Sequence, residues 1–186
     1  MNKLTILATL LLAGCFSSSE VRYAVPEISP QARVSVAYRS VEVRDVTLPS
    51  YAELEEIFVE TLDGSLTSSA LLWADDPSRG VTLELTRALA VITQRPVASE
   101  PWPFESFPDA RVEVRVEEFV ASLRTQEFRL AGQYFVASLE GRGQDRSGVF
   151  RVSVALPEEP GPGIIAAARG QAMALLAEQI AEEGLR

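Results

Sequence analysis

Hydrophobic and polar positions along the chain alternate in some stretches and follow helical spacing in others. The alternation typical of strands occurs in six stretches. These are residues 32–46, 56–62, 65–72, 110–119, 127–139 and 148–156. Apolar residues at helical spacing begin at Asp76-Pro77 and recur over residues 164–183. The order of three strands, a helix, three strands and a helix predicts a single α+β domain. Its two helices should pack on a mixed, largely antiparallel sheet.

Residues that favour turns and caps mark the borders of these elements. Asp63-Gly64 is typical of a β-hairpin between the second and third strands. Asp76 can cap the first helix, and Pro77 suits its first turn. Two apolar stripes are expected to face the sheet: Val81, Leu85, Ala88, Leu89 and Ile92 on the first helix, and Ile165, Ala168, Ala172, Leu175 and Ile180 on the second. The four prolines within residues 94–108 predict a structured loop without regular secondary structure.

The N-terminus has the layout of a secretory signal peptide. Lys3 and the free amine supply positive charge, residues 4–13 are almost continuously apolar, and small residues precede Cys15. The apolar stretch is too short to span a hydrocarbon core, which needs roughly 20 apolar residues. We therefore expect residues 1–14 to be a signal peptide.

The end of this segment, Leu12-Ala13-Gly14-Cys15, resembles the bacterial lipobox. The resemblance implies that the Cys15 sulfur is acylated and that the chain is held on a membrane surface without spanning it. We expect residues 15–31 to form the lipidated N-terminus and a flexible linker, and residues 32–186 to form the domain. The residue after the cysteine is Phe16 and not an aspartate. By the sorting rule described for many Gram-negative lipoproteins, this favours delivery to the outer membrane, so we expect the protein on the periplasmic face of that membrane.

Composition narrows the classes of function. The formal net charge is −9, and Lys3 is the only lysine, so an acidic surface makes nucleic acid an unsuitable partner. The chain has no histidine and one cysteine, which excludes a Ser-His-Asp triad, histidine metal ligands and a disulfide within the chain. Among enzymes, only those that use carboxylates alone remain open. We expect no catalytic activity, no cofactor and no metal site.

Three local features have both a chemical and a structural interpretation. Asp75-Asp76 could be a carboxylate pair, but a cap beside Pro77 explains it better. Gly141-Arg142-Gly143 is a weak match to a phosphate-binding loop and lacks the following helix, so a turn is the better explanation. Trp73 is expected in the core at a strand-to-helix corner. Trp102, in the proline-rich loop, could lie in the core or act as an exposed anchor for a partner.

Several short motifs follow one another over nearly the whole chain after Cys15. They are Tyr23 before the first strand, Leu48-Pro49-x-Tyr51 after it, Trp73-Ala74-Asp75 before the first helix, Pro101-Trp102, Arg111-Val112-x-Val114-x-Val116-x-x-Phe119, and Leu175-Leu176-Ala177-x-Gln179-Ile180-Ala181. In order and spacing they resemble the ABC-type transport auxiliary lipoproteins, the PqiC-like family typified by paraquat-inducible protein C. The chain departs from the family pattern at Ala52, Leu54-Glu55, Leu72 and Asp76.

The resemblance implies a non-catalytic accessory component of an MCE/ABC-type phospholipid transport system that supports envelope integrity. Its expected partners are the membrane, reached through the lipid on Cys15, and an MCE-domain tunnel protein. A homo-oligomeric ring is also an expectation from the family. Tyr51, Trp73 and Trp102 are the candidate partner-binding residues.

Two other classes remain open from the sequence. The chain could be an envelope scaffold or activator lipoprotein that regulates peptidoglycan synthesis or outer-membrane assembly, since such a protein would share the anchor and the α+β domain. A hydrolase with paired carboxylates is the third class.

Overall fold

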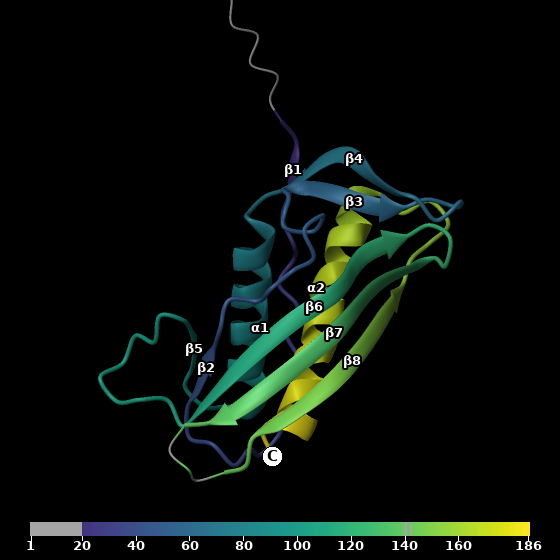
Figure 1. Ribbon diagram of the computed structural model, residues 1–186. Helices are drawn as coiled ribbons and strands as arrows, with labels where there is room; N and C mark the ends of the chain where they lie inside the picture. The colour runs from purple at the N-terminus through teal and green to yellow at the C-terminus, as the bar shows by residue number, and fades with distance from the viewer. Residues whose placement is uncertain (1–19, 140, 142) are drawn as a thin grey trace, which may run out of the picture.

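The computed structural model describes residues 20–139, 141 and 143–186. These residues form a sheet of eight strands with two helices on one of its faces (Figure 1). The strands are β1 (Arg22–Tyr23), β2 (Val41–Val43), β3 (Glu56–Glu60), β4 (Leu66–Trp73), β5 (Val97–Ser99), β6 (Ala110–Ser122), β7 (Glu127–Ser138) and β8 (Arg146–Ala155). The helices are α1 (Pro77–Thr93) and α2 (Pro162–Gln179), and a π-helical turn, η1 (Ile180–Gly184), continues α2.

Strand β6 joins the parts of the sheet. Along one side it pairs antiparallel with β7 over its whole length, and β7 pairs antiparallel with β8. Along the other side its first residues pair in parallel with β2, and its last two residues pair in parallel with β3. Strand β3 continues through the hairpin to β4 and then to β1, while β2 continues to β5.

Apolar and charged residues alternate along β6, so one face of the strand is buried and the other faces solvent. Val112, Val114 and Val116 are buried under the helices, whereas Arg111 and its alternate neighbours reach the opposite face. The helices α1 and α2 pack on each other and on the inner face of the sheet (Figure 1). The fold class predicted from the sequence, an α+β domain with a largely antiparallel mixed sheet and two helices on it, is confirmed.

The predicted hairpin and first helix are also confirmed. Gly64 has φ +87°, a conformation that glycine adopts without strain, and it lies between β3 and β4. The Asp76 side chain accepts a hydrogen bond of 2.8 Å from the backbone N–H of Arg79 and so caps α1, with Pro77 in the first turn. All five residues of the predicted apolar stripe on α1 are buried.

The predicted first strand, residues 32–46, is wrong for most of its length. Only Val41–Val43 pair as a strand, although Val34, Val36 and Tyr38 are buried. The reason is what lies beside this segment: Val34 donates its backbone N–H to Ile92 O and Ala37 donates to Leu185 O, so the partners are helix ends rather than a strand. An alternating pattern reports burial on one side and does not identify the neighbour.

The proline-rich stretch contains a short strand that the sequence analysis excluded. Residues Val97–Ser99, the part of 94–108 between two prolines, form β5 and pair in parallel with β2. Together with β1, this gives four strands before each helix instead of the predicted three.

The predicted apolar stripe on the second helix is confirmed at Ile165, Ala168, Ala172 and Ile180, which are buried, but not at Leu175. Leu175 is 39% exposed, whereas Arg169 and Gly170 are buried. Helix α2 lies between the sheet, α1 and the extended segment before β2, so its buried face is wider than the predicted stripe, while Ile164, Gln171 and Leu175 mark its exposed side.

The folded unit begins before Ala32. Tyr23 O accepts a 3.0 Å hydrogen bond from Ala74 N, and β1 pairs with the end of β4. Residues 25–28 then cross α2 at Gly170, where an added Cβ would lie 2.9 Å from a Val25 methyl carbon and 3.2 Å from Pro26 O. The segment predicted as a flexible linker therefore packs against the domain from Arg22 onward.

Gly132 provides a test of the closest backbone approach in the sheet. A Cβ there would lie 2.2 Å from Arg115 O and 2.9 Å from Val116 Cα, beside the irregularity between Val116 and Glu118. Because backbone atoms cannot move aside as side chains do, Gly132→Ala should lower the free energy of unfolding by about 2–3 kcal/mol. Urea denaturation followed by circular dichroism measures this difference.

The control is Gly161→Ala, where an added Cβ meets no atom within 4 Å. It should lower the denaturation midpoint much less than Gly132→Ala, because its only cost is a less favourable residue at the N-cap of α2. Equal midpoints for the two variants would contradict the close packing of β6 on β7.

Candidate partner-binding site

Cys15, the predicted lipidation site, lies outside the described residues, so its modification stays a prediction. The described chain starts at Glu20, and Arg22 connects it to the body of the protein. The Arg22 guanidinium donates 2.8 Å to Glu55 and 3.2 Å to the carbonyl of Trp73. The start of the described chain is therefore joined to the end of β4.

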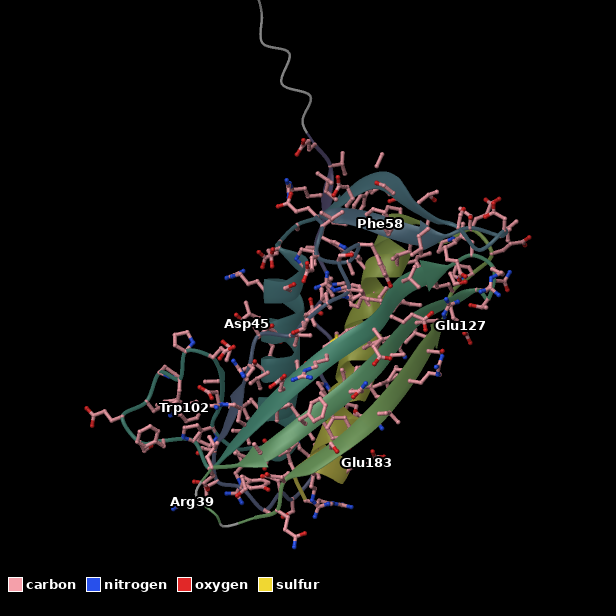
Figure 2. The ribbon with its side chains drawn as sticks, in the orientation of Figure 1. Arg39, Asp45, Phe58, Trp102, Glu127 and Glu183 are labelled. Atoms are coloured by element: carbon pink, nitrogen blue, oxygen red, sulfur yellow. The ribbon has the colours of Figure 1, made fainter. Side chains whose placement is uncertain are left out.

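The segment between β5 and β6, residues 100–109, projects from the body of the protein on its own, and we call it the aromatic loop (Figures 1 and 2). Its two ends are held by backbone and ionic contacts. At the first end, Glu100 donates its backbone N–H to Val43 O at 2.9 Å, and its carboxylate accepts from Asp45 N at 3.0 Å. At the second end, the Asp109 carboxylate accepts bonds of 3.0 and 3.2 Å from the Arg39 guanidinium.

The tip of the aromatic loop presents aromatic side chains to solvent. Phe107 is 83% exposed and Phe104 is 53% exposed. Trp102 is half-buried, and its indole N–H donates a 2.6 Å bond to Ser106 O. Its ring meets Phe104 edge to face, with centroids 4.9 Å apart. Trp102 is thus neither in the domain core nor fully exposed: it braces the loop that displays the two phenylalanines.

Tyr51 has a structural contact at the irregularity of β6. Its hydroxyl accepts a 3.0 Å hydrogen bond from Phe119 N, and its ring packs edge to face with Phe58. Burial raises the pKa of this hydroxyl above its ordinary value. The bond satisfies a backbone N–H next to the point where β6 loses its regular register with β7.

Trp73 is 4% exposed, so within the chain it has the core position expected for it. The Arg169 guanidinium lies over its ring at 4.7 Å and over the Phe119 ring at 5.6 Å. Arg169 itself is 2% exposed and pairs with Glu84 of α1 at 3.0 Å. Gly80 permits this arrangement, because an added Cβ there would lie 2.9 Å from Arg169 Nη2.

The pair between Arg169 and Glu84 holds the two helices together at a cost. Burial raises the pKa of the Glu84 carboxyl and lowers the pKa of the Arg169 guanidinium, because burial disfavours both charged forms. Arg169 Nε and Glu84 Oε2 are buried without a hydrogen-bond partner among the described residues. The aromatic rings of Trp73 and Phe119 therefore supply part of the stabilisation of the guanidinium.

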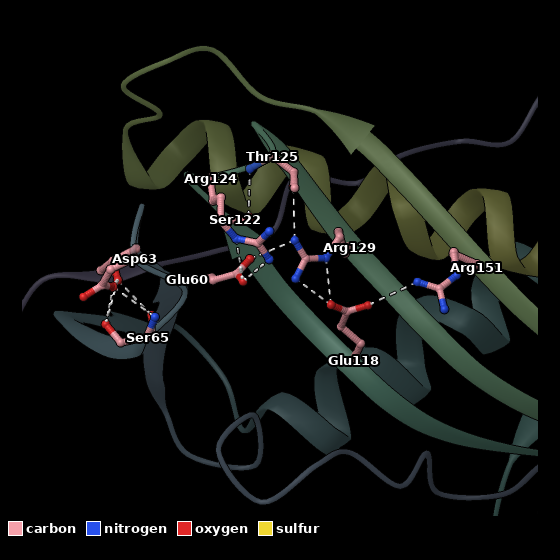
Figure 3. Close-up of polar contacts among 10 residues, drawn as sticks. Glu60, Asp63, Ser65, Glu118, Ser122, Arg124, Thr125, Arg129 and Arg151 are labelled. Carbon is pink, nitrogen blue, oxygen red and sulfur yellow. Dashed lines mark hydrogen bonds and ion pairs between the residues drawn. The ribbon is translucent and has the colours of Figure 1, made fainter.

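A second group of charges connects β3, β6 and β7 (Figure 3). It lies where β6 meets β3, at the end of β6 away from the aromatic loop (Figure 1). Glu60, 6% exposed, accepts 2.6 Å from Arg124 and 2.8 Å from Arg129. Arg129 also pairs with Glu118 at 2.6 Å, and Arg151 of β8 approaches the other oxygen of Glu118 at 3.8 Å. This network of ion pairs lies on the solvent-facing side of the sheet and connects the strands where β3 joins β6.

The described residues contain neither a candidate metal site nor a helix that could span a membrane. Residues 20–139, 141 and 143–186 contain no group of three or more histidine, cysteine, aspartate or glutamate side chains that could hold a metal ion. None of the helices within the same residues is long and apolar enough to cross a membrane.

Solved structures share this α+β architecture. One is the crystal structure of an uncharacterised protein, with a TM-score of 0.69 and 16% identity, covering 88% of this chain and 98% of that chain. Another is a protein of the DUF330 family from Xanthomonas campestris, with a TM-score of 0.61 and 15% identity, covering 86% and 88%. A PelC dodecamer from Paraburkholderia phytofirmans aligns with a TM-score of 0.49 and 12% identity over 86% and 95% of the two chains.

The family follows from a match along the sequence. The model of the ABC-type transport auxiliary lipoprotein component matches residues 23–181, so the chain belongs to this family. This confirms the family resemblance, and it defines the protein as a transport auxiliary lipoprotein. Comparison with curated protein sequences gives no significant match.

Sequence reasoning missed several residues that the structure emphasises. Phe104 and Phe107 stand beside Trp102 among four prolines, a signal that could have predicted an aromatic tip. Arg169 follows three alanines in an otherwise apolar stretch of helix, which could have indicated a buried charge. Its partner Glu84 carries no comparable signal, because only packing brings the two helices together.

Glu60 gives the stability of the protein a dependence on pH. Hydrogen bonds from Ser122 first, and then from Arg124 and Arg129, lower the pKa of Glu60 to about 2 from an ordinary value of 4.5. Its stabilising contribution is therefore complete above pH 4.5 and is lost as the pH falls toward 2. Glu60→Gln should lower the free energy of unfolding at pH 7 by about 2 kcal/mol, after allowing for solvent screening of the partly exposed arginines.

The measurement is chemical denaturation between pH 7 and pH 2. The difference between the wild type and Glu60→Gln should shrink steadily below pH 4.5. Glu158→Gln, a change at an exposed position, serves as the control and should show no such trend. A difference that stays constant with pH would contradict the charged network.

Proposed function

We propose that the protein is anchored by lipid on Cys15 to the periplasmic face of the outer membrane and serves as a non-catalytic accessory of an MCE/ABC-type phospholipid transport system. The observation that carries the proposal is the family match over residues 23–181. In this role the protein supports envelope integrity by docking the MCE-domain tunnel protein.

The segment between Cys15 and the fold is short, and this fixes which end of the domain lies near the membrane. Because β1 is already part of the fold, only the residues between Cys15 and Arg22 remain to connect the domain to the lipid. The seven Cα–Cα steps from Cys15 to Arg22 reach at most about 25 Å. The end of the domain that carries β1, β3 and β4 is therefore held close to the bilayer.

The aromatic loop lies toward the other end of the molecule (Figures 1 and 2). The thirteen residues of β6 separate this loop from the junction with β3, a distance of about 40 Å at the usual rise of a strand. An anchor at one end directs the loop away from the outer membrane and into the periplasm. Because the loop points away from the outer membrane, its partner is expected to be a protein in the periplasm and not the membrane itself.

The chemistry of the tip fits a protein interface. Exposed aromatic side chains on a backbone held at both ends can be buried by a partner with little loss of conformational entropy. Phe104 and Phe107 supply the apolar area, while Trp102 is already committed to bracing the loop.

The proposal is tested by affinity purification of the full chain from membranes solubilised in mild detergent after crosslinking. Recovery of an MCE-domain protein supports it. Recovery of a peptidoglycan synthase or its regulators instead, with unchanged lipid asymmetry of the outer membrane in a deletion strain, would favour the alternative of an envelope activator.

Cys15→Ala tests the anchor. The variant should move from the membrane fraction to the soluble periplasmic fraction, because no acyl chain remains to be buried. Its circular dichroism spectrum should match that of the mature wild type, since the folded unit begins after this position. Membrane association that resists a high-salt wash in the variant would contradict lipid anchoring.

The double variant Phe104→Ser/Phe107→Ser tests the aromatic loop. It should reduce recovery of the MCE-domain protein at least tenfold, the order expected for loss of hot-spot residues. Leu62→Ser, a change at a 76% exposed residue near the hairpin of β3 and β4, is the matched control. Equal recovery with the two variants would contradict docking through the loop.

A further inference from the structure

Strand β8 forms an open border of the sheet (Figure 1). Within residues 20–139, 141 and 143–186 it pairs with one strand only, β7. It contributes ten residues, Arg146–Ala155, whereas the terminal strands of the other two branches, β1 and β5, have two and three residues. Among the strands that end a branch of the described sheet, β8 is therefore the longest.

The direction of the backbone along this edge follows from one contact. Gln179 Nε2 donates a 3.3 Å bond to Val149 O, so this carbonyl points away from β7. In an antiparallel ladder, the N–H and C=O of one residue point to the same side and alternate along the strand. Ser147, Arg151 and Ser153 therefore also direct their backbone groups outward.

Two usual protections of an edge strand, a proline and a bulge, are missing from β8, and the bond from Gln179 covers only the Val149 carbonyl. The strand contains no proline, and its ten residues pair with β7 in an uninterrupted register without a bulge. Its outward row includes Val149, which is 76% exposed, and no lysine. A long, regular and partly apolar edge is a template for strand addition.

The charges on the edge indicate what kind of strand fits. The side chain of Arg151 is 78% exposed and approaches Glu118 only at 3.8 Å. The strand itself contains two arginines and no carboxylate, although the whole chain is acidic. An added strand with a carboxylate opposite Arg151 and an apolar residue opposite Val149 would be complementary.

We propose that the edge of β8 binds an extended segment of a partner protein in which carboxylate and apolar side chains alternate. A second copy of this chain fits less well. The two antiparallel registers with the greatest overlap of β8 with itself place two Arg151 side chains directly or diagonally opposite each other, with no carboxylate on either strand to balance them. The proposal is separate from the transport role, because it does not depend on which assembly contains the partner.

A fluorescently labelled peptide supplies a direct test with the full mature chain. The probe is ten residues long: glutamate and valine alternate at every second position, and threonine occupies the positions between them. A matched probe carries lysine in place of each glutamate. In fluorescence anisotropy titrations, the glutamate probe should bind about fivefold or more tightly than the lysine probe, the ratio expected for cross-strand charge pairs. Equal affinities, or no binding of either probe, would overturn the proposal.

Two variants separate backbone from side-chain contributions. Val149→Pro removes an outward N–H and should weaken binding of the glutamate probe at least tenfold, while Val149→Thr keeps that N–H and should retain most of the affinity. Arg151→Glu, which leaves the backbone intact, should reverse the preference between the two probes. An unchanged preference in Arg151→Glu would overturn the charge complementarity even if Val149→Pro failed to fold.

Analytical ultracentrifugation of the unlabelled chain tests whether a second copy of this chain, instead of a partner protein, binds the edge of β8. We expect the mass of the wild type and of Arg151→Glu to be the same. A wild-type oligomer that dissociates in Val149→Pro but persists in Val149→Thr would show that a second copy covers the edge, and would overturn the proposal.

Discussion

The structure depends on one strand, β6, that serves two partners along the same side. Its first residues pair with β2, its last residues pair with β3, and β7 covers its other side throughout. Buried valines on its inner face belong to the same core cluster as buried residues of both helices, while charged residues occupy the outer face. Removing this strand would separate the β2 and β5 branch from the β1, β3 and β4 branch. Long-range pairing of this kind makes the domain a single cooperative unit.

A buried charge pair plays the corresponding role between the helices. Arg169 lies on the rings of Trp73 and Phe119 and reaches Glu84, so one side chain contacts α1, β4 and β6. Replacing such a pair by apolar residues is often neutral for stability, whereas loss of one partner is costly. The pair therefore specifies how α2 sits against α1 more than it adds to stability. The N-terminal segment crosses α2 at Gly170, the residue after Arg169, and completes the cover.

The two ends of the molecule carry different features, and β8 borders the sheet. At one end, β1 is built into the sheet only a few residues after the predicted lipidation site, and toward the other end, the aromatic loop is held by Glu100 and Asp109. The edge of β8 runs between them. A component that joins a membrane to an envelope assembly needs this separation, because the anchor must not compete with the surfaces that contact partners.

The sequence by itself determined the hairpin at Gly64 and the cap at Asp76, because each depends on residues close together in the chain. It also determined the fold class and the family, because the order of elements and of short motifs can be followed along the chain. The tertiary structure decided the partners of those elements. Alternating valines in 32–46 reported burial correctly but not that helix ends, rather than a strand, lie beside them. Trp102 looked the same as a core or a surface residue until its bond to Ser106 and the exposure of Phe107 were seen. Periodicity records how much of a segment is covered; only the three-dimensional arrangement of distant segments determines what covers it.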